Sequence, residues 1–356
     1  MTPKELGFFM PPEWAKHDGT WLSWPHNLDS WPGKFEPVPD VFIELIRFLS
    51  PHEEVHINVA GAEMEQDIRR RVQEGGIVRD AVANIFYHHF PTNDAWCRDH
   101  GPNFVLRKMP NGQVERAIID WGYNAWGGKY PPFDLDDKIP AQVAELMGVQ
   151  RFVPGMILEG GSIDTNGKGT LLTTTSCLLN PNRNPELSQA EIEHNLKEYL
   201  GMTKILWLED GIVGDDTDGH IDDISRFVNP TTIVTAVEEN PDDENYEPLQ
   251  KNLELLKTFT DQDGNPFNIV EIPMPPKIEF EDERLPASYA NFYIANNVVL
   301  VPTYRHANDY KVVEILQPLF PDRRVQAVDC TDLVLGLGAI HCVTHESPSL
   351  DALSEL

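Results

Sequence analysis

Short segments with strand-like and helix-like patterns alternate along almost the whole chain of 356 residues. Residues 54–59 alternate as a half-buried strand does, whereas Val41, Phe42, Leu45 and Leu49 recur at the spacing of a helix face. Further strands are predicted at 84–87, 104–107, 115–119, 169–175, 231–237, 268–272, 298–301 and 325–328, and further helices at 64–72, 189–200, 244–259 and 310–319. This alternation predicts an α/β fold, and the many short strands fit an ordinary Rossmann sheet poorly.

The chain is not divided by a composition shift or a long polar linker, so we expect one catalytic domain over residues 1–356. Its 28 Lys and Arg stand against 57 Asp and Glu, and this charge disfavours nucleic acid and anionic membranes as partners but suits a cationic substrate. No apolar stretch approaches the ~18 residues of a membrane helix. The first residues also lack the apolar segment of a secretory signal, so the expected location is the cytoplasm.

One cysteine follows a glycine-containing turn near the end of the sequence. An apolar run at 333–335 meets Gly336 and Gly338, and Cys342 comes shortly after them. This order places a thiol at the edge of a structural element, where a nucleophile can act. A buried structural thiol is the alternative, and this stretch alone favours it. The four cysteines show no C-x-x-C pairing, so neither a zinc site nor a disulfide framework is expected.

Two polar clusters lie beside glycines or strand ends. Asp99 follows Trp96 and precedes a predicted strand, so its carboxylate could receive a cation against an aromatic wall. A turn ion pair between Arg98 and Asp99 is the alternative. Glu159 precedes Gly160-Gly161 and could serve as a general acid or base, but the local pattern alone favours a surface turn.

A third cluster is the aspartate-rich segment 214–223. A calcium-binding EF-hand loop fails here, because its first and twelfth positions fall on Gly214 and Ser225 and lack the required carboxylates. In a strand-like segment, His220 and Asp222 would project from the same face and place a proton-transfer group beside a carboxylate. A solvated acidic loop is the alternative.

Together these clusters offer one thiol, one imidazole and three carboxylates. A Cys-His amidase needs only one orienting carboxylate, so three exceed its requirements. A guanidinium presents five N–H donors in one plane, and carboxylates match that geometry. The combination therefore favours a planar cationic substrate. The residues concerned are Cys342, His220, Asp99, Glu159 and Asp222.

An ordered set of motifs along nearly the whole chain resembles the agmatine deiminase family. That family is grouped with the bacterial peptidyl-arginine deiminases in the guanidino-group-modifying superfamily. The motifs are Pro12-Glu13-Trp14, Trp96 with Arg98-Asp99, Asp120-Trp121-Gly122-Tyr123, Glu159-Gly160-Gly161-Ser162, Asn180-Pro181-Asn182-Arg183, Thr217-Asp218-Gly219-His220-Ile221-Asp222, Asn291-Phe292-Tyr293 and Ile340-His341-Cys342.

The resemblance implies a five-bladed, pseudo-symmetric α/β propeller of ββαβ units, with no metal and no cofactor. It implies Cys342 as the nucleophile, His220 as the general acid/base and Glu159 as a further catalytic carboxylate. Asp99 and Asp222 would bind the guanidinium. Three further residues are expected near the substrate: Trp96, Trp121 and Asn291.

The implied reaction is hydrolysis of agmatine to N-carbamoylputrescine and ammonia through a covalent thiouronium on Cys342. This hydrolase step belongs to putrescine and polyamine metabolism, and a homo-oligomer is a further expectation. A protein-arginine deiminase that forms citrulline is the alternative, and a Cys-His amidase is a more distant one. The chain departs from the commonest family form at Leu337, Ala339, His345 and Glu346, which leaves the choice of substrate open.

Overall fold

The computed structural model describes residues 1–354, and its strands form five sheets that share one connectivity, plus one small hairpin. In each of the five sheets, an antiparallel pair of strands is followed by a helix and a strand that pairs in parallel with the second strand. The α/β prediction is therefore confirmed. The last two residues of the expected domain, 355 and 356, lie outside the described residues.

Four of these sheets are built from consecutive strands. They are β4 (Asn103–Lys108), β5 (Val114–Ile119) and β6 (Gln150–Phe152); β7 (Asp164–Thr165), β8 (Thr170–Thr174) and β9 (Lys204–Leu208); β10 (Ser225–Asn229), β11 (Thr232–Val237) and β12 (Asn268–Pro273); and β15 (Tyr293–Ile294), β16 (Val298–Thr303) and β17 (Arg324–Asp329). Their crossover helices are α6 (Ile139–Met147), α8 (Gln189–Leu200), α9 (Tyr246–Thr258) and α10 (Ala307–Leu316). The hairpin is β13 (Glu279–Phe280) with β14 (Glu283–Arg284).

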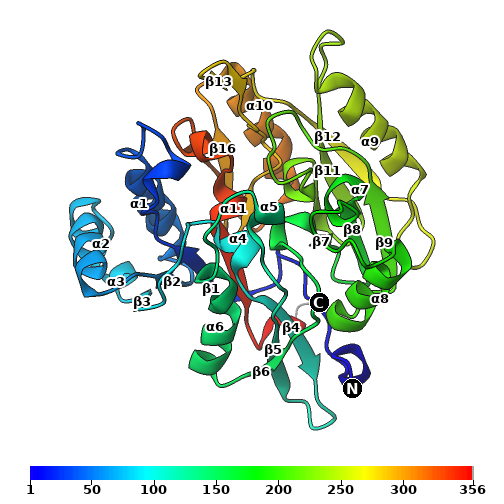
Figure 1. The fold of residues 1–356 in the computed structure, drawn as a ribbon, viewed down its shortest axis with the longest axis horizontal. Coiled ribbons are helices and arrows are strands. Elements are labelled where there is room, and N and C mark those ends of the chain that lie inside the picture. The colour runs from blue at the N-terminus through cyan, green and yellow to red at the C-terminus, as the bar shows by residue number, and fades with distance from the viewer. Residues whose placement is uncertain (355–356) are drawn as a thin grey trace.

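The fifth sheet joins the two ends of the chain. Strand β18 (Thr344–Pro348) pairs antiparallel with β1 (His17–Ser23), and Leu22 lies opposite Thr344. Strands β2 (Glu54–Asn58) and β3 (Ile85–His88) continue the sheet in parallel, with α1 (Val38–Leu49) and α2 (Ala62–Glu74) as crossovers. The C-terminal strand is thereby held beside the first one (Figure 1).

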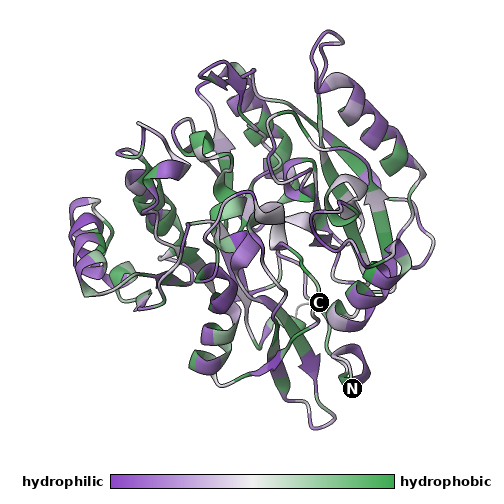
Figure 2. Ribbon diagram, viewed as in Figure 1, coloured by the Kyte–Doolittle hydropathy of each residue, from purple (hydrophilic) through white to green (hydrophobic). Residues whose placement is uncertain are grey.

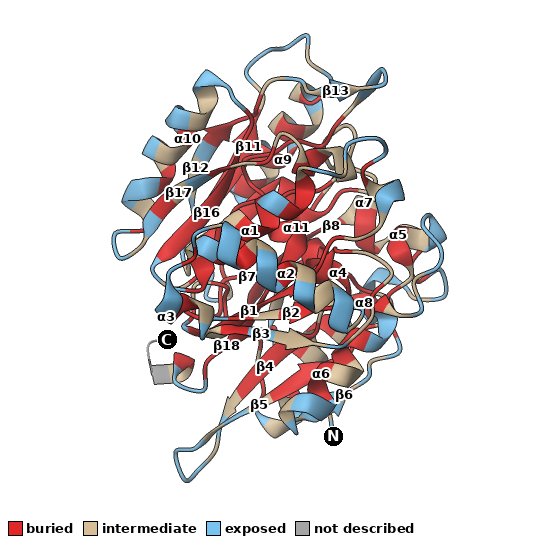
Figure 3. Ribbon diagram, turned by 90° about the vertical axis from the view of Figure 1, so that its left-hand side faces the viewer, coloured by how far each residue is buried: buried red, intermediate tan, exposed pale blue. Residues whose placement is uncertain are grey.

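The crossover helices lie on the outside and turn their apolar faces toward the strands (Figures 2 and 3). In α1, Val41, Phe42, Leu45 and Leu49 are buried, as their spacing predicts. Helix α8 begins at a capping box in which the Ser188 hydroxyl accepts from the Glu191 amide. Each predicted strand and helix overlaps an observed one. Within the described residues, no helix has the length and apolar character needed to cross a membrane.

Candidate active site

Four short elements at strand ends bring the predicted site residues together. They are α4 (Cys97–His100), η4 (Gly160–Ser162), η5 (Ile221–Asp223) and α11 (Ile340–Val343). Helix α4 contacts both α11 and η4, and η4 contacts η5. Helices α4 and α11 lie near the middle of the molecule, between the sheets (Figure 1). The polar clusters that are far apart in the sequence therefore meet in the interior.

The geometry around Gly161 shows how closely these side chains converge. A Cβ atom added to Gly161 would lie 2.6 Å from His220 Nδ1, 2.8 Å from Asp99 Oδ1 and 2.9 Å from Asp222 Oδ2. His220 Nδ1 is 3.6 Å from Asp99 Oδ1. Neither ring nitrogen of His220 has a hydrogen-bond partner among the described residues, although the side chain is buried. One imidazole and two carboxylates thus share a single small volume.

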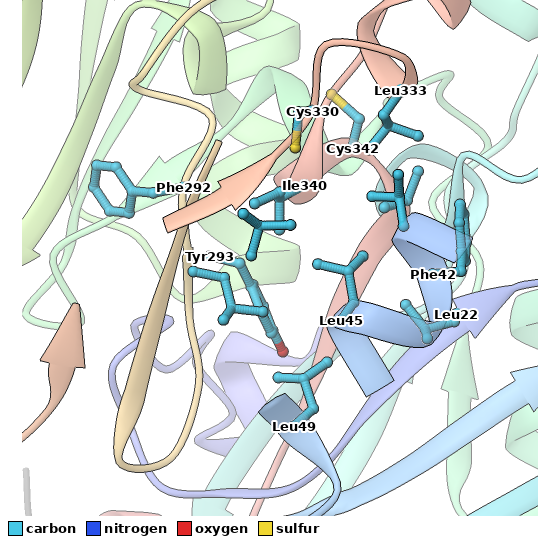
Figure 4. Packing of buried hydrophobic residues seen from close by; sticks show 14 of the residues in the cluster. Leu22, Phe42, Leu45, Leu49, Phe292, Tyr293, Cys330, Leu333, Ile340 and Cys342 are labelled. Atoms are coloured by element: carbon cyan, nitrogen blue, oxygen red, sulfur yellow. The ribbon is translucent and has the colours of Figure 1, made fainter. Parts of the chain in front are cut away.

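Cys342 completes this volume from α11. Its Sγ atom lies 3.9 Å from Asp222 Oδ2 and accepts a hydrogen bond from Asn291 Nδ2 at 3.2 Å. Figure 4 shows the thiol at the border of the apolar cluster that contains Leu333 and Cys330. The thiol also lines a cavity, so it is buried on one side and accessible on the other. This is the placement that a nucleophile needs.

The cavity has a volume of about 720 Å³ and an acidic lining. Asp99, Cys342, Trp96 and Trp126 contribute to its wall. The one basic residue in the wall, Arg284, pairs with Asp243 at 2.7 Å, so its charge is neutralised. The other acidic residues of the wall are Asp29, Asp94, Asp215, Asp216, Glu281 and Glu283. Such a wall attracts a cation.

Burial and mutual repulsion shift the titration of the central groups. Burial raises the pKa of Asp99 to about 6, and the Asp222 carboxylate acts in the same direction. Burial lowers the pKa of His220, but the carboxylates of Asp99 and Asp222 outweigh it and raise the pKa above its ordinary value. Burial also raises the pKa of the Cys342 thiol, as do nearby carboxylates. A cation is therefore needed to stabilise the thiolate.

Glu159 lies in the core rather than in a surface turn. Its side chain is fully buried, and Oε1 accepts from Arg183 Nε at 2.6 Å. The atoms of Glu159, Cys177 and His220 that could ligate a metal ion lie within 4.8 Å of one another. Because the Arg183 guanidinium already neutralises the carboxylate, we regard this group as part of an ion-paired site and not as a metal site. Nothing in the sequence pattern singled out Arg183 as its partner.

The two predicted tryptophans lie in different places. Trp96 lines the cavity, whereas Trp121 packs against Tyr199 in a separate core cluster, and its proximity to the substrate stays a prediction. Trp126, which was not among the predicted site residues, lines the cavity and donates from Nε1 to Asp99 Oδ2 at 2.9 Å. The chain turns here because Ala125 and Trp126 adopt left-handed backbone conformations, with φ of 51° and 55°.

The local conformation predicted for residues 220–222 is also corrected. His220 precedes the 3₁₀ helix η5, so a turn and not a strand brings it to Asp222. The neighbouring acidic loop is ion-paired instead of simply solvated, since Lys129 Nζ lies 2.9 Å from Asp218 Oδ1 and Arg183 bonds the other Asp218 oxygen. Asp99 is likewise no partner of Arg98, which instead donates to Glu346 at 2.7 Å.

The turn before Cys342 owes its shape to Leu337 and its packing to the glycines. Leu337 adopts the left-handed conformation, with φ of 69°. A Cβ on Gly336 would lie 2.6 Å from Trp31, and one on Gly338 would lie 2.5 Å from Trp96. The glycines therefore allow two tryptophans to approach the backbone, which differs from the flexible role that the sequence indicates.

We expect Gly161→Ala to remove most activity while leaving the fold intact. The added methyl group would occupy the space between His220, Asp99 and Asp222 and displace either these side chains or the substrate. Gly61→Ala is the matched control, because a Cβ there meets nothing within 4 Å. Ammonia release and thermal unfolding of both variants provide the measurement. Full activity of Gly161→Ala would show that the reaction takes place elsewhere.

Comparison with known proteins identifies the family. A family model described as Porphyromonas-type peptidyl-arginine deiminase matches residues 9–348. A Yersinia pestis protein that is provisionally named an agmatine deiminase is 36% identical over 369 residues, covering 98% of this chain and 97% of that protein. The structure of the Enterococcus faecalis agmatine deiminase has a TM-score of 0.89 at 33% identity, with 98% of both chains covered. A C. jejuni agmatine deiminase with a cysteine-to-serine substitution and bound substrate has a TM-score of 0.83 at 32% identity, with 96% of both chains covered. The chain therefore belongs to the Porphyromonas-type peptidyl-arginine deiminase family, and the agmatine deiminases are among its relatives.

Proposed function

We propose that this protein hydrolyses agmatine to N-carbamoylputrescine and ammonia. The observation that carries the proposal is the convergence of Cys342, His220, Asp99 and Asp222, two of which, Asp99 and Cys342, line an acidic cavity. Deimination of guanidino compounds is the chemistry named for the relatives. Agmatine carries a second cation at its far end, and the many carboxylates of the wall favour such a dication.

In the proposed complex, Asp99 and Asp222 bind the guanidinium and place its central carbon against Cys342 Sγ. Asp222 Oδ1 has no hydrogen-bond partner among the described residues and can accept from the guanidinium. Binding orients the substrate before the reaction begins. This can lower the activation barrier by ~7 kcal/mol or more. Trp96 and Trp126 are two of the aromatic residues in the cavity wall, against which the alkyl chain of the substrate can pack.

The reaction then proceeds in two stages. The thiolate of Cys342 forms a C–S bond to the guanidinium carbon, and His220 donates a proton to one nitrogen, which departs as ammonia with the C–N electron pair. The remaining thiouronium is covalently attached to Cys342. His220, now neutral, accepts a proton from water as its oxygen attacks the same carbon. The C–S bond breaks and the thiolate is regenerated, while the remaining hydroxyl proton passes to the released ammonia, which becomes ammonium, and the neutral ureido product leaves.

The positive charge that favours the thiolate comes from the substrate and from His220. Burial and the carboxylates of Asp222, Asp223 and Asp99 raise the pKa of Cys342. A bound guanidinium neutralises those carboxylates and brings a cation to the sulfur, which lowers the cost of ionisation. Substrate binding and nucleophile activation are therefore coupled in this proposal. The C. jejuni structure with substrate bound to a cysteine-to-serine variant supports a cysteine as the reacting group.

A parallel assay of agmatine, free arginine and a blocked arginine peptide tests the function. We expect ammonia release with agmatine and far less with the two arginine compounds, because an α-carboxylate or a peptide would face an acidic wall. Release mainly from the peptide would establish a protein-arginine deiminase instead. Hydrolysis of simple amides with no ammonia from any guanidine would establish a Cys-His amidase.

We also propose that the five sheets are the blades of a pseudo-symmetric propeller within one catalytic domain. The repeated ββαβ connectivity supports this arrangement. The pairing of β1 with β18 supports it as well, because a circular array requires its first and last strands to meet. The catalytic residues would then lie near its axis.

We expect agmatine affinity to fall as the pH drops through about 6, the pKa of Asp99. The carboxyl group is ionised above this pH and neutral below it, and only the carboxylate pairs with the guanidinium. Affinity should therefore decline by about tenfold per pH unit below the pKa. Calorimetry with an inactive Cys342→Ala variant measures binding without turnover. Asp99→Asn in the same background should bind weakly at every pH, and an unchanged affinity there would contradict the pairing.

A further inference from the structure

A buried histidine outside the proposed catalytic set lies between two carboxylates. His341 Nδ1 is 2.7 Å from Asp222 Oδ2, and His341 Nε2 is 2.7 Å from Glu13 Oε2. The histidine is 2% exposed, Asp222 is fully buried and Glu13 is 7% exposed. Glu13 and Asp222 come from distant parts of the chain, so His341 connects the N-terminal segment to the catalytic residues.

Both carboxylates facing this ring are ionised. Burial raises the pKa of Glu13, but the Arg226 guanidinium and His341 outweigh it and hold the pKa well below its usual value. Burial also raises the pKa of Asp222, and the hydrogen bond from His341 overcomes it. Each ring nitrogen of His341 therefore lies within hydrogen-bond distance of an acceptor oxygen, one on Asp222 and one on Glu13.

The contacts of Glu13 keep the ring in place. Glu13 Oε1 accepts from the Ile294 amide at 2.8 Å and pairs with Arg226 at the same distance. The amide of His341 donates to Asn291 Oδ1 at 2.9 Å. Both the side chain and the backbone of His341 are thus fixed, and the residue can in turn fix Asp222.

We propose that His341 is a positioning residue that, held by Glu13, keeps Asp222 oriented for guanidinium binding. One Asp222 oxygen is bonded to His341, and the other has no partner among the described residues. This arrangement leaves the second oxygen for the substrate. The inference rests on the proposed guanidine chemistry and adds a residue to it.

Several titratable or charged groups surround His341 and Asp222, and a pH profile of binding reflects all of them. They are Glu13, Arg98 and Asp99 from α4, Asp164 from β7, Asp215, His220 and Asp223 around η5, Arg226 from β10, Cys342 from α11 and His345 from β18.

Two variants of His341 separate positioning from a merely structural role. In His341→Asn the amide nitrogen lies near the position of Nδ1 and can still donate to Asp222. In His341→Gln it reaches the position of Nε2 and can donate only to Glu13. We expect agmatine affinity to fall about tenfold in the first and about a hundredfold in the second, the range for a hydrogen bond to a charged group. If His341 served only to anchor Glu13, His341→Asn would lose more agmatine affinity than His341→Gln. That order would overturn the proposal.

The pH dependence of binding gives a second test, measured in the Cys342→Ala background. In the parent, the decline toward low pH should follow one proton, that of Asp99. Without the hydrogen bond from His341, which lowers the pKa of Asp222, that carboxylate should also take up a proton, and the slope should approach two protons. An unchanged slope in both His341 variants would overturn the proposal. His345→Gln is the control, because it replaces a nearby buried histidine that is uncharged. Burial lowers the pKa of His345 to about 3. We expect this variant to show the same pH dependence of binding as the Cys342→Ala protein alone.

Imidazole NMR of the unmodified protein tests the His341 contacts without any substrate. We expect a hydrogen-bonded ring N–H signal that exchanges slowly with water and that vanishes in His341→Asn. A ring signal that exchanges freely with water would overturn the proposal. If the Cys342→Ala protein binds no agmatine at any pH, the proposed substrate is wrong, and this signal still decides whether His341 is held between the two carboxylates.

Discussion

Cys342→Ala should lose roughly ten-thousand-fold or more of its ammonia release, the scale seen when a catalytic nucleophile is removed. The thiol lies 3.9 Å from Asp222 Oδ2 and lines the cavity, so it is the group that can reach a bound guanidinium carbon. Agmatine binding should persist, because the carboxylates remain. A coupled ammonia assay and calorimetry measure the two effects separately.

Cys330→Ala is the matched control for this result. Cys330 is a buried free cysteine in the same apolar cluster as Cys342 but does not line the cavity. We expect it to lose some thermal stability and to keep its turnover. Mass spectrometry of the acid-quenched native enzyme should also detect substrate-derived mass on the peptide that contains Cys342. Appreciable turnover by Cys342→Ala would remove this cysteine from the mechanism.

His220→Gln should lower kcat by about 100- to 10,000-fold, the usual contribution of a general acid/base. Glutamine keeps a polar side chain of similar size but cannot transfer a proton. The effect should exceed the loss of substrate affinity, because Asp99 and Asp222 still bind the guanidinium. Steady-state kinetics separate kcat from KM, and calorimetry gives the affinity directly.

His100→Gln controls for the removal of a buried histidine near the site. Burial lowers the pKa of His100 to about 3, so it carries no charge at neutral pH, and it lies on α4 beside Asp99. We expect a lower unfolding temperature with kcat within a few fold of the native value. If His220→Gln retained native kcat, proton transfer would have to be assigned to another residue.

Much of the fold could be predicted from the sequence because its signals are local. The apolar face of α1 and the capping box at Ser188 depend only on neighbouring residues. The repeated connectivity could not be predicted from these signals, because β7 and β15 contain two residues each and leave no periodic pattern. Pairing between strands far apart in sequence is a tertiary property.

For the site, the sequence supplied the residue types and the structure supplied their partners. Glycines and strand ends indicated Asp99, Glu159 and His220, and the fold brings them together. The position of Trp126 in the cavity wall could not be predicted, because it depends on a left-handed backbone conformation at a residue that is not glycine. The role of His341 was missed for a different reason: its significance lies in Glu13, which is a neighbour only after folding.

The pairing of β1 with β18 has a consequence for the order of folding. Strand β18 begins two residues after Cys342 and pairs with the first strand of the described chain. The thiol is therefore anchored by a contact between segments that are more than 300 residues apart in the sequence. Because such long-range strand pairing forms slowly, we expect the candidate site to be completed late in folding.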